Sequence, residues 1–246
     1  MSVLPAVDVL VAVPAHDEAD RIGACLSSVA DALRHGRATG AVRTARVAVG
    51  LHRCTDATET VARAALAGTA GVEAVLRHEP RDLLVGAVRT ALVRHGAVRP
   101  TRFGPDAWVF STDADTVVPP DWVSATLALR RHGRVDLVLG LTDLLGWDVD
   151  EATRSAYEAI VSAGLTAGGH GHAYAANLAI RLAAFEAVGG FPALPHGEEH
   201  GLAAAVRDAG LGVVSSLAPR VQTSGRMPGR AADGLGALLS RLAEGR

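Results

Sequence analysis

One stretch of the sequence gives the clearest indication of the fold: Trp108-Val109-Phe110-Ser111-Thr112-Asp113-Ala114-Asp115-Thr116-Val117-Val118-Pro119-Pro120-Asp121-Trp122. Its apolar start predicts a buried central strand, and the two prolines predict where that strand has ended. The carboxylates of Asp113 and Asp115 therefore fall at the C-terminal end of a strand, where open α/β sheets bind their ligands. Neighbouring ionised carboxylates repel each other unless a cation lies between them. A hard divalent ion, Mg2+ or Mn2+, suits such oxygen ligands.

Length and composition limit the classes of protein that this chain can belong to. Its 246 residues are enough for one large α/β domain or two small ones. The formal net charge of −2 argues against a general nucleic-acid binder. No stretch approaches the roughly 20 apolar residues of a membrane-spanning helix, so no integral membrane segment is expected. Cys25 and Cys54 are predicted to be reduced thiols, which fits a cytoplasmic protein.

The apolar pattern predicts strands that alternate with amphipathic helices along the first 141 residues or so. This rhythm is typical of a doubly wound, mostly parallel α/β sheet with helices on both faces. The predicted strands cover residues 7–13, 46–51, 72–76, 108–110 and 135–141.

Candidate site residues lie in the loops after the first two predicted strands and within the third predicted helix. Pro14, His16 and Glu18 lie in the loop after the first strand, where acids can also serve simply to cap a helix. His52 ends the second strand, and Asp56 is placed to cap the next helix. Arg89 lies in the third helix, as a phosphate contact or as an ordinary solvated arginine.

Further candidates lie in the second half of the chain. His170 and His172 are two apart in a glycine-rich loop; one of them is a candidate Mn2+ ligand, or both are exposed loop residues. Asn177 is the only asparagine in the sequence, which weakly suggests a specific role. Glu198 and Glu199 precede a helix, where acids also favour the helix dipole. The last predicted strand covers residues 211–217, and Arg226 lies in a polar segment with several glycines after it.

Five short motifs, taken in order, resemble those of family 2 glycosyltransferases. The resemblance covers nearly the whole chain, and its most specific string is Asn177-Leu178-Ala179-Ile180-Arg181 followed by Val188-Gly189-Gly190-Phe191. The other four are Pro14 to Glu18, Cys54 to Thr58, Asp113 to Asp115, and Glu198-Glu199.

The resemblance implies a GT-A (Rossmann-like) fold in a single domain over residues 1–246. About 1–118 would form the half that binds the nucleotide sugar, and about 119–246 the acceptor-binding and catalytic half. It implies transfer, with inversion, of a sugar from a nucleotide-diphosphate donor to an acceptor hydroxyl. Mn2+ or Mg2+ would be held by Asp113 and Asp115, with His170 or His172 as further ligands.

The resemblance also implies roles for individual residues. Glu199, beside Glu198, would be the base that deprotonates the acceptor, with His200 as the runner-up. The residues expected to line the nucleotide and substrate site are Pro14, His16, Glu18, His52, Asp56, Arg89, Asp113, Asn177 and Arg226.

Three departures from the family pattern keep other functions open. Leu51 and His52 replace the Asp that usually contacts the base, Glu199 replaces an Asp, and Ala175-Ala176 stand where Gly is common. His52 could instead contact a base or ribose, or the fold could be a non-catalytic nucleotide- or sugar-binding protein. A nucleotidyltransferase is a lesser alternative, because the acidic loop from Pro14 to Glu18 is not the glycine-rich, basic loop that it needs. The sugar, the base, the acceptor and a homodimeric state are left open.

Overall fold

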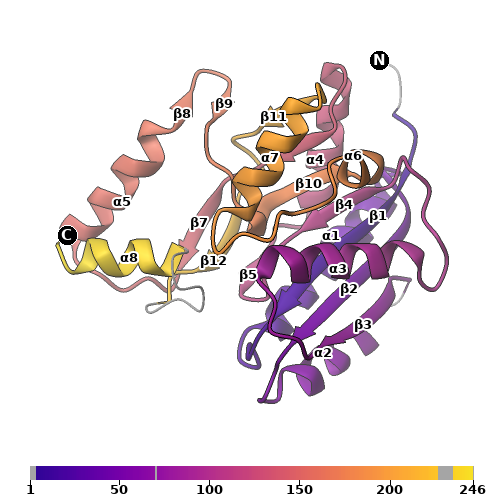
Figure 1. Ribbon diagram of the computed structural model, residues 1–246, viewed down its shortest axis with the longest axis horizontal. Helices are drawn as coiled ribbons and strands as arrows, with labels where there is room; N and C mark the ends of the chain where they lie inside the picture. Colours follow the sequence, from indigo (N-terminus) through magenta and orange to yellow (C-terminus); the bar gives the residue numbers. More distant parts are fainter. Residues whose placement is uncertain (1–3, 70, 227–234, 246) are drawn as a thin grey trace.

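The computed structural model describes residues 4–69, 71–226 and 235–245. These residues form an α/β body around a seven-stranded sheet (Figure 1). In the described chain, only β10 of this sheet runs antiparallel to its neighbours. The predicted doubly wound, mostly parallel sheet is therefore confirmed. In spatial order the strands are β11 (Val213–Ser215), β6 (Leu137–Leu139), β10 (Leu178–Arg181), β4 (Trp108–Ser111), β1 (Val7–Ala15), β2 (Val42–His52) and β3 (Glu73–Glu79).

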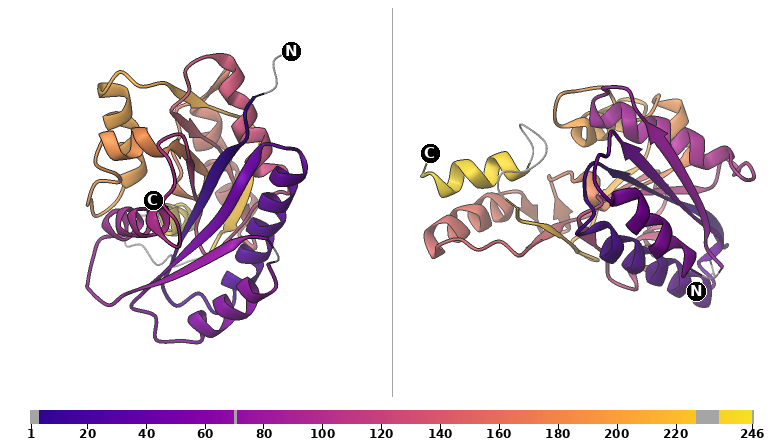
Figure 2. Two further views of the ribbon diagram at one scale, coloured as in Figure 1. Left: turned by 90° about the vertical axis from the view of Figure 1, so that its right-hand side faces the viewer. Right: turned by 90° about the horizontal axis from the view of Figure 1, so that it is seen from below.

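Helices cover both faces of the sheet, as Figure 2 shows from two further sides. The central strand β1 is apolar on both sides: Val9 and Val11 join one buried cluster, and Leu10 joins the other. This is the pattern expected of a parallel strand buried on both faces. The first cluster includes α1 (Ile22–Ala38), α2 (Thr58–Ala67) and α4 (Trp122–Ala128), and the second includes α3 (Val85–Val98), α6 (Leu182–Ala187) and α7 (Glu198–Asp208).

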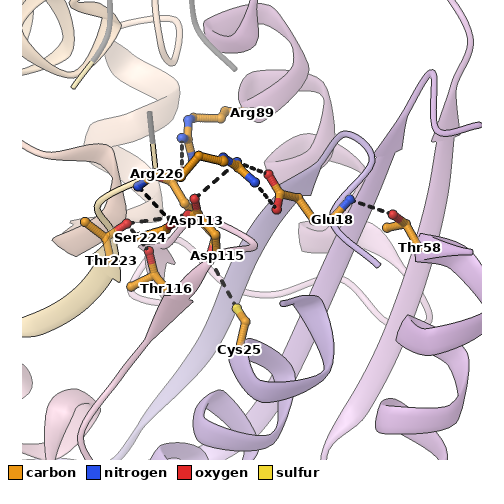
Figure 3. Close-up of polar contacts among 10 residues, drawn as sticks. All are labelled: Glu18, Cys25, Thr58, Arg89, Asp113, Asp115, Thr116, Thr223, Ser224 and Arg226. Carbon is orange, nitrogen blue, oxygen red and sulfur yellow. Dashed lines mark hydrogen bonds and ion pairs between the residues drawn. The ribbon is translucent and has the colours of Figure 1, made fainter. Parts of the chain in front are cut away.

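A second, three-stranded sheet brings the end of the chain back to the centre. Strand β12 (Val221–Ser224) pairs with β5 (Thr116–Val117) on one side and with β7 (Thr142–Leu145) on the other. The polar segment from Val221 onward, for which the sequence predicts no strand, thus contributes one here. Because β5 directly follows Asp115, β12 places Ser224 and Arg226 beside the carboxylates of the motif (Figure 3).

An arm of two helices projects from the body (Figure 1). It consists of α5 (Glu151–Ala163) and α8 (Leu235–Ala243), which pack around a small cluster of Trp147, Tyr157 and Leu239. The remaining short elements are the pair β8 (Leu165–Thr166) and β9 (Gly169–His170) and the 3-10 turns η1 (Leu129–His132) and η2 (Ala175–Asn177).

A buried arginine ties the first half of the sheet to α3. Arg46 in β2 is fully buried, and its guanidinium donates to Glu73 Oε2 at 2.8 Å, to the Gly96 carbonyl at 2.6 Å and to the Thr101 carbonyl at 2.9 Å. Its Cζ atom also lies 4.0 Å from the centre of the Phe103 ring. These contacts fix the C-terminal half of α3, the helix that carries Arg89.

We expect Arg46→Met to lower the free energy of unfolding by about 2–4 kcal/mol, because it removes the donor of the buried Gly96 carbonyl and of the partly buried Thr101 carbonyl. Arg43→Gln on the same strand is the matched control. Arg43 pairs with Asp8 at the surface, and such a pair contributes at most about 1 kcal/mol. Urea denaturation of both variants checks this, and equal losses would contradict the role assigned to Arg46.

Candidate active site

Carboxylates from two neighbouring strands converge at one edge of the sheet. Strands β1 and β4 are parallel partners, so their C-terminal ends meet at the same edge. Glu18 lies in the loop after β1, and Asp113 and Asp115 lie in the loop after β4. Figure 3 shows the three side chains turned toward one another. The structure therefore brings together the acids that the sequence places in separate motifs.

Arg89 joins this group from inside the protein. Its side chain is 5% exposed and donates to Ser111 Oγ at 3.0 Å, to the Asp113 carboxylate and, at 3.4 Å, to Glu198 Oε1. One turn earlier in α3, Gly86 has no room for a Cβ, which would lie 2.1 Å from the Pro192 carbonyl oxygen. This close approach sets Arg89 between Asp113 and the start of α7.

Arg226 reaches the same carboxylates from the C-terminal part of the chain. Its two Nη atoms lie 2.5 and 3.1 Å from the Glu18 carboxylate oxygens, a bidentate pair, and Nη2 is also 3.4 Å from Asp115 Oδ2 (Figure 3). Thr223 Oγ1 is likewise 3.4 Å from Asp115 Oδ1. Arg226 is one of the sequence-predicted site residues, whereas the approach of Thr223 and the pairing of Arg226 with Glu18 and Asp115 depend on the pairing of β12 with β5, which local sequence does not reveal.

Burial and the repulsion of neighbouring carboxylates disfavour the ionised form of Asp115. Burial contributes most, followed by the negative charges of Asp113 and Glu18, and together they raise the pKa of Asp115 to about 6 despite the nearby Arg226 guanidinium. A carboxyl whose pKa is raised by like charges is one whose ionised form a cation would stabilise. Asp113 and Asp115 supply the oxygen donors that Mg2+ and Mn2+ prefer, so these residues fit a divalent ion.

The two predicted histidine ligands lie elsewhere. A ring nitrogen of His170 lies 3.2 Å from the Ser216 carbonyl oxygen and one of His172 lies 2.8 Å from the Val161 carbonyl oxygen, and their rings stack 5.9 Å apart. Within the described residues, no group of three or more His, Cys, Asp or Glu side chains is arranged to hold a metal ion. The structure thus does not assemble Asp113 and Asp115 with His170 or His172, because backbone carbonyls bind the histidine rings.

Reciprocal hydrogen bonds join the loops after β1 and β2. Asp17 accepts from the Thr55 amide at 2.7 Å, and Asp56 accepts from the Ala19 amide at 3.1 Å. The Glu18 amide in turn donates to Thr58 Oγ1 at 2.7 Å. Asp17 adopts a φ of +51°, in the left-handed region, so this network holds a strained turn. Asp17 fixes the backbone of Glu18, a role that the sequence does not reveal.

His16 and His52 close the other side of this edge. A ring nitrogen of His16 lies 2.7 Å from the His52 carbonyl oxygen, and one of His52 lies 3.0 Å from the Arg81 carbonyl oxygen. Because a carbonyl only accepts, both of these nitrogens carry hydrogens. Pro14, the second-last residue of β1, is half-buried. The contacts of these residues with a nucleotide stay predictions.

A pocket of about 190 Å³ opens next to these loops, at the ends of β2 and β3. It is lined mainly by polar and charged side chains, and Asp56 is the one sequence-predicted site residue on its wall. The full lining is Leu51, Arg53, Cys54, Asp56, Glu59, His78, Glu79 and Pro80. Cys54, like Cys25, is a free cysteine, as expected for reduced thiols.

Asn177 occupies a buried crossing point of the fold. Its Oδ1 atom accepts from Trp122 Nε1 at 2.9 Å, and its Nδ2 atom donates to the Leu141 and Pro219 carbonyls at 2.8 and 3.0 Å. Both amide hydrogens are thus used by the protein. The side chain holds β10, α4 and the turn before β12 in register, which gives the single asparagine a positioning role. Its predicted contact with substrate stays a prediction.

Glu198 and Glu199 begin α7, directly after Gly197, whose φ is +74°. Glu198 is buried against Arg89, whereas Glu199 is half-buried. Burial and, after it, the negative charge of Glu198 raise the pKa of Glu199 to about 7. A carboxyl with a pKa near neutrality is suited to accept a proton in a reaction.

The raised pKa of Glu199 predicts a pH-dependent loss of stability. The folded protein holds the proton more tightly than the unfolded chain, so stability falls as the pH rises from about 4.5 toward 7. Glu199→Gln removes this loss. The free energy of unfolding of this variant should exceed that of the wild type by on the order of 1–3 kcal/mol at pH 8, and by a smaller margin at pH 5. Denaturant titrations at both pH values test this. Glu158→Gln, on the exposed side of α5, is the control and should show the same difference at both.

The described part of the chain contains no helix long and apolar enough to cross a membrane.

Comparison with known proteins establishes the fold. No protein-family model matches this sequence, and no curated protein matches it. Solved structures do. The mannosyltransferase PcManGT from Pyrobaculum calidifontis, in complex with GDP-Man and Mn2+, matches with a TM-score of 0.67 and 18% identity, over 95% of this chain and 62% of that one.

Two other similar structures are glycosyltransferases as well. S. aureus TarS with UDP-GlcNAc matches with a TM-score of 0.61 and 15% identity, over 96% of this chain and 65% of that one. Glucosyl-3-phosphoglycerate synthase from Mycobacterium tuberculosis, with Mn2+ and UDP-Glc, matches with a TM-score of 0.58 and 20% identity, over 96% of this chain and 76% of that one. The chain spans less than two thirds of PcManGT and of this TarS structure. At these sequence identities the similarity shows the fold alone. The chain has the GT-A fold that these nucleotide-sugar glycosyltransferases share.

Proposed function

We propose that this protein is a metal-dependent glycosyltransferase that moves a sugar from a nucleotide-diphosphate donor to an acceptor hydroxyl, with inversion. The observation that carries the proposal is the bridge formed by Arg89, which joins Asp113 of the carboxylate motif to Glu198 at the start of α7, on one edge of a GT-A sheet. The GDP-Man, UDP-GlcNAc and UDP-Glc complexes of the structural neighbours support a nucleotide-sugar donor.

Each group at this edge has a role in the proposed reaction. Asp113 and Asp115 hold Mn2+ or Mg2+, and a bound divalent ion supplies Lewis-acid neutralisation of the leaving diphosphate. Glu199 accepts the proton of the acceptor hydroxyl as that oxygen attacks the anomeric carbon. Burial and, after it, the negative charge of Glu198, which pairs with Arg89, raise the pKa of Glu199 and make it a stronger base.

The remaining predicted residues belong to the donor and acceptor sites of this proposal. The donor side is the loop edge of Pro14, His16, Glu18, His52 and Asp56. The acceptor side is the second half of the chain, from about residue 119 onward. We place the enzyme in the cytoplasm, with no nucleic acid among its partners and a homodimeric state open.

A specific observation favours activity over the binding-only alternative. Glu199 is half-buried next to the Arg89–Glu198 ion pair, and a carboxyl with a raised pKa in such a place is suited to accept a proton.

Thermal unfolding against nucleoside diphosphates and their sugars, with and without Mn2+, tests donor binding. A ligand at about 100 times its dissociation constant should add about 2.7 kcal/mol of stability. We expect a Mn2+-dependent shift with one nucleotide class for the wild type and for the exposed control Asp148→Asn, and none for Asp115→Asn. An equal shift in Asp115→Asn would remove Asp115 from the metal site.

Turnover tests the base. With GDP-Man, UDP-GlcNAc or UDP-Glc as donor and water as a minimal acceptor, Glu199→Gln should lower the rate of sugar release by roughly 10²–10⁴-fold. It should leave the Mn2+-dependent thermal shift intact, because Glu199 is not a metal ligand in this proposal. The wild-type rate should rise with pH through about 7, where Glu199 loses its proton. Binding without turnover of any donor in the wild type would instead support the non-catalytic alternative.

A further inference from the structure

Two arginines neutralise the carboxylates of the site, and they differ in how firmly they are held. Arg89 is buried and divides its donors among Ser111, Asp113 and Glu198. The Arg226 side chain is 21% exposed, and among the described residues its guanidinium forms ion pairs only with Glu18 and Asp115. Of the two cations, Arg226 is therefore the one that can leave without opening the core.

We propose that Arg226 is an internal counter-ion that competes with a divalent cation for Asp115 and Glu18, and that it turns to the donor diphosphate once the cation has entered. This inference rests on the proposed function for the identity of the anionic ligand. The competition itself rests on the contacts of Arg226 alone.

The electrostatics favour competition. Arg226 Nη2 lies 2.5 Å from Glu18 and 3.4 Å from Asp115, so one positive charge sits between two carboxylates. A divalent ion bound at Asp115 would carry twice that charge and would repel the guanidinium at short range. The planar fork of arginine pairs with a diphosphate as well as with a carboxylate, so a released Arg226 has a ready partner in the donor.

The surrounding structure lets the side chain move while the backbone stays fixed. The Gly225 amide donates to the Leu145 carbonyl at 3.0 Å, and a Cβ at Gly225 would lie 2.4 Å from Trp147 Cβ. The Arg226 amide donates to Ser224 Oγ at 3.2 Å. Thr223 Oγ1 also meets Thr116 Oγ1 at 2.9 Å, which ties β12 to the strand after Asp115. These contacts hold the backbone of the segment that ends at Arg226, so in the proposed exchange it is the Arg226 side chain that moves.

The test is a titration of the full chain with Mn2+ alone, read by the loss of the electron paramagnetic resonance signal of free Mn2+. We expect Arg226→Gln to bind Mn2+ roughly tenfold more tightly than the wild type, because a positive charge has left the site. Adding Asp115→Asn to Arg226→Gln should abolish the gain. Unchanged or weaker Mn2+ binding by Arg226→Gln would overturn the inference.

Arg220→Gln is the matched control. Arg220 directly precedes β12 and pairs with Asp143 at 2.7 Å, away from Glu18 and Asp115. This variant should bind Mn2+ as the wild type does. Arg226→Lys keeps the positive charge and should stay within about threefold of the wild type. A tenfold gain in either variant would show that charge removal at the site is not the cause, and would overturn the inference.

The second half of the exchange is measured with GDP and UDP as probes at saturating Mn2+. Arg226→Gln should bind the preferred diphosphate about five- to tenfold more weakly than the wild type, since a charge-assisted pair is lost. Equal affinity would overturn the handover to the diphosphate. Tighter Mn2+ binding by Arg226→Gln together with no binding of either diphosphate by any variant would uphold the competition and count against the transferase proposal. The two can thus fail separately.

Discussion

Repulsion among carboxylates at one edge of the sheet is the constraint on which the site depends. Glu18, Asp113 and Asp115 approach one another because parallel strands end together, and Glu198 adds a fourth acid across Arg89. Like charges at such distances need cations among them. Arg89 and Arg226 supply these, and each comes from a segment far from the acids in sequence. The ion pairs therefore also connect the chain: α3 to α7, and β12 to the loop after β1.

The scaffold gives the two arginines different roles because it buries them to different degrees. Arg89 sits on a helix held tightly at both ends, by the close approach of Gly86 to Pro192 and by the contacts of Arg46 with Gly96. A guanidinium fixed in this way sets the distance between Asp113 and Glu198. Arg226 lies two residues after β12, the central strand of the small sheet, and its side chain is partly exposed to solvent. Only its side chain has to move for the charge balance of the site to change.

The sequence predicted the features that are local and failed at those that depend on distant contacts. The apolar run from Trp108 is β4, and the acids after it lie at the strand end, as its pattern predicts. The helix α7 also follows from sequence, although Glu198 and Glu199, which the sequence places just before it, form its first turn. By contrast, the stretch at Val221 forms a strand only because β5 and β7 offer edges to pair with, which no periodicity within four residues can reveal.

Single residues show the same difference between what local sequence predicts and what depends on distant contacts. The lone Asn177 is correctly singled out by its rarity, but its partners Trp122, Leu141 and Pro219 come from three different segments, so its structural role is invisible locally. By sequence, Arg89 is either a solvated arginine or a phosphate contact. The fold buries it between Asp113 and Glu198, so it is not solvated, and its contact with a phosphate stays a prediction. His170 and His172 do share one side, as an extended segment predicts, yet backbone carbonyls rather than carboxylates lie beside them.

The two raised pKa values complete the physical argument for a ligand at this edge. The pKa is raised to about 6 for Asp115 and to about 7 for Glu199, so each is less stable as an anion in the fold than in water. Free energy is thus stored as unfavourable charge at neutral pH, in a part of the molecule otherwise held by buried hydrogen bonds. A bound cation relieves Asp115, and a proton taken from a substrate relieves Glu199. Both costs disappear in the complex that the proposed reaction requires, which is the arrangement expected where function rather than stability has set the residues.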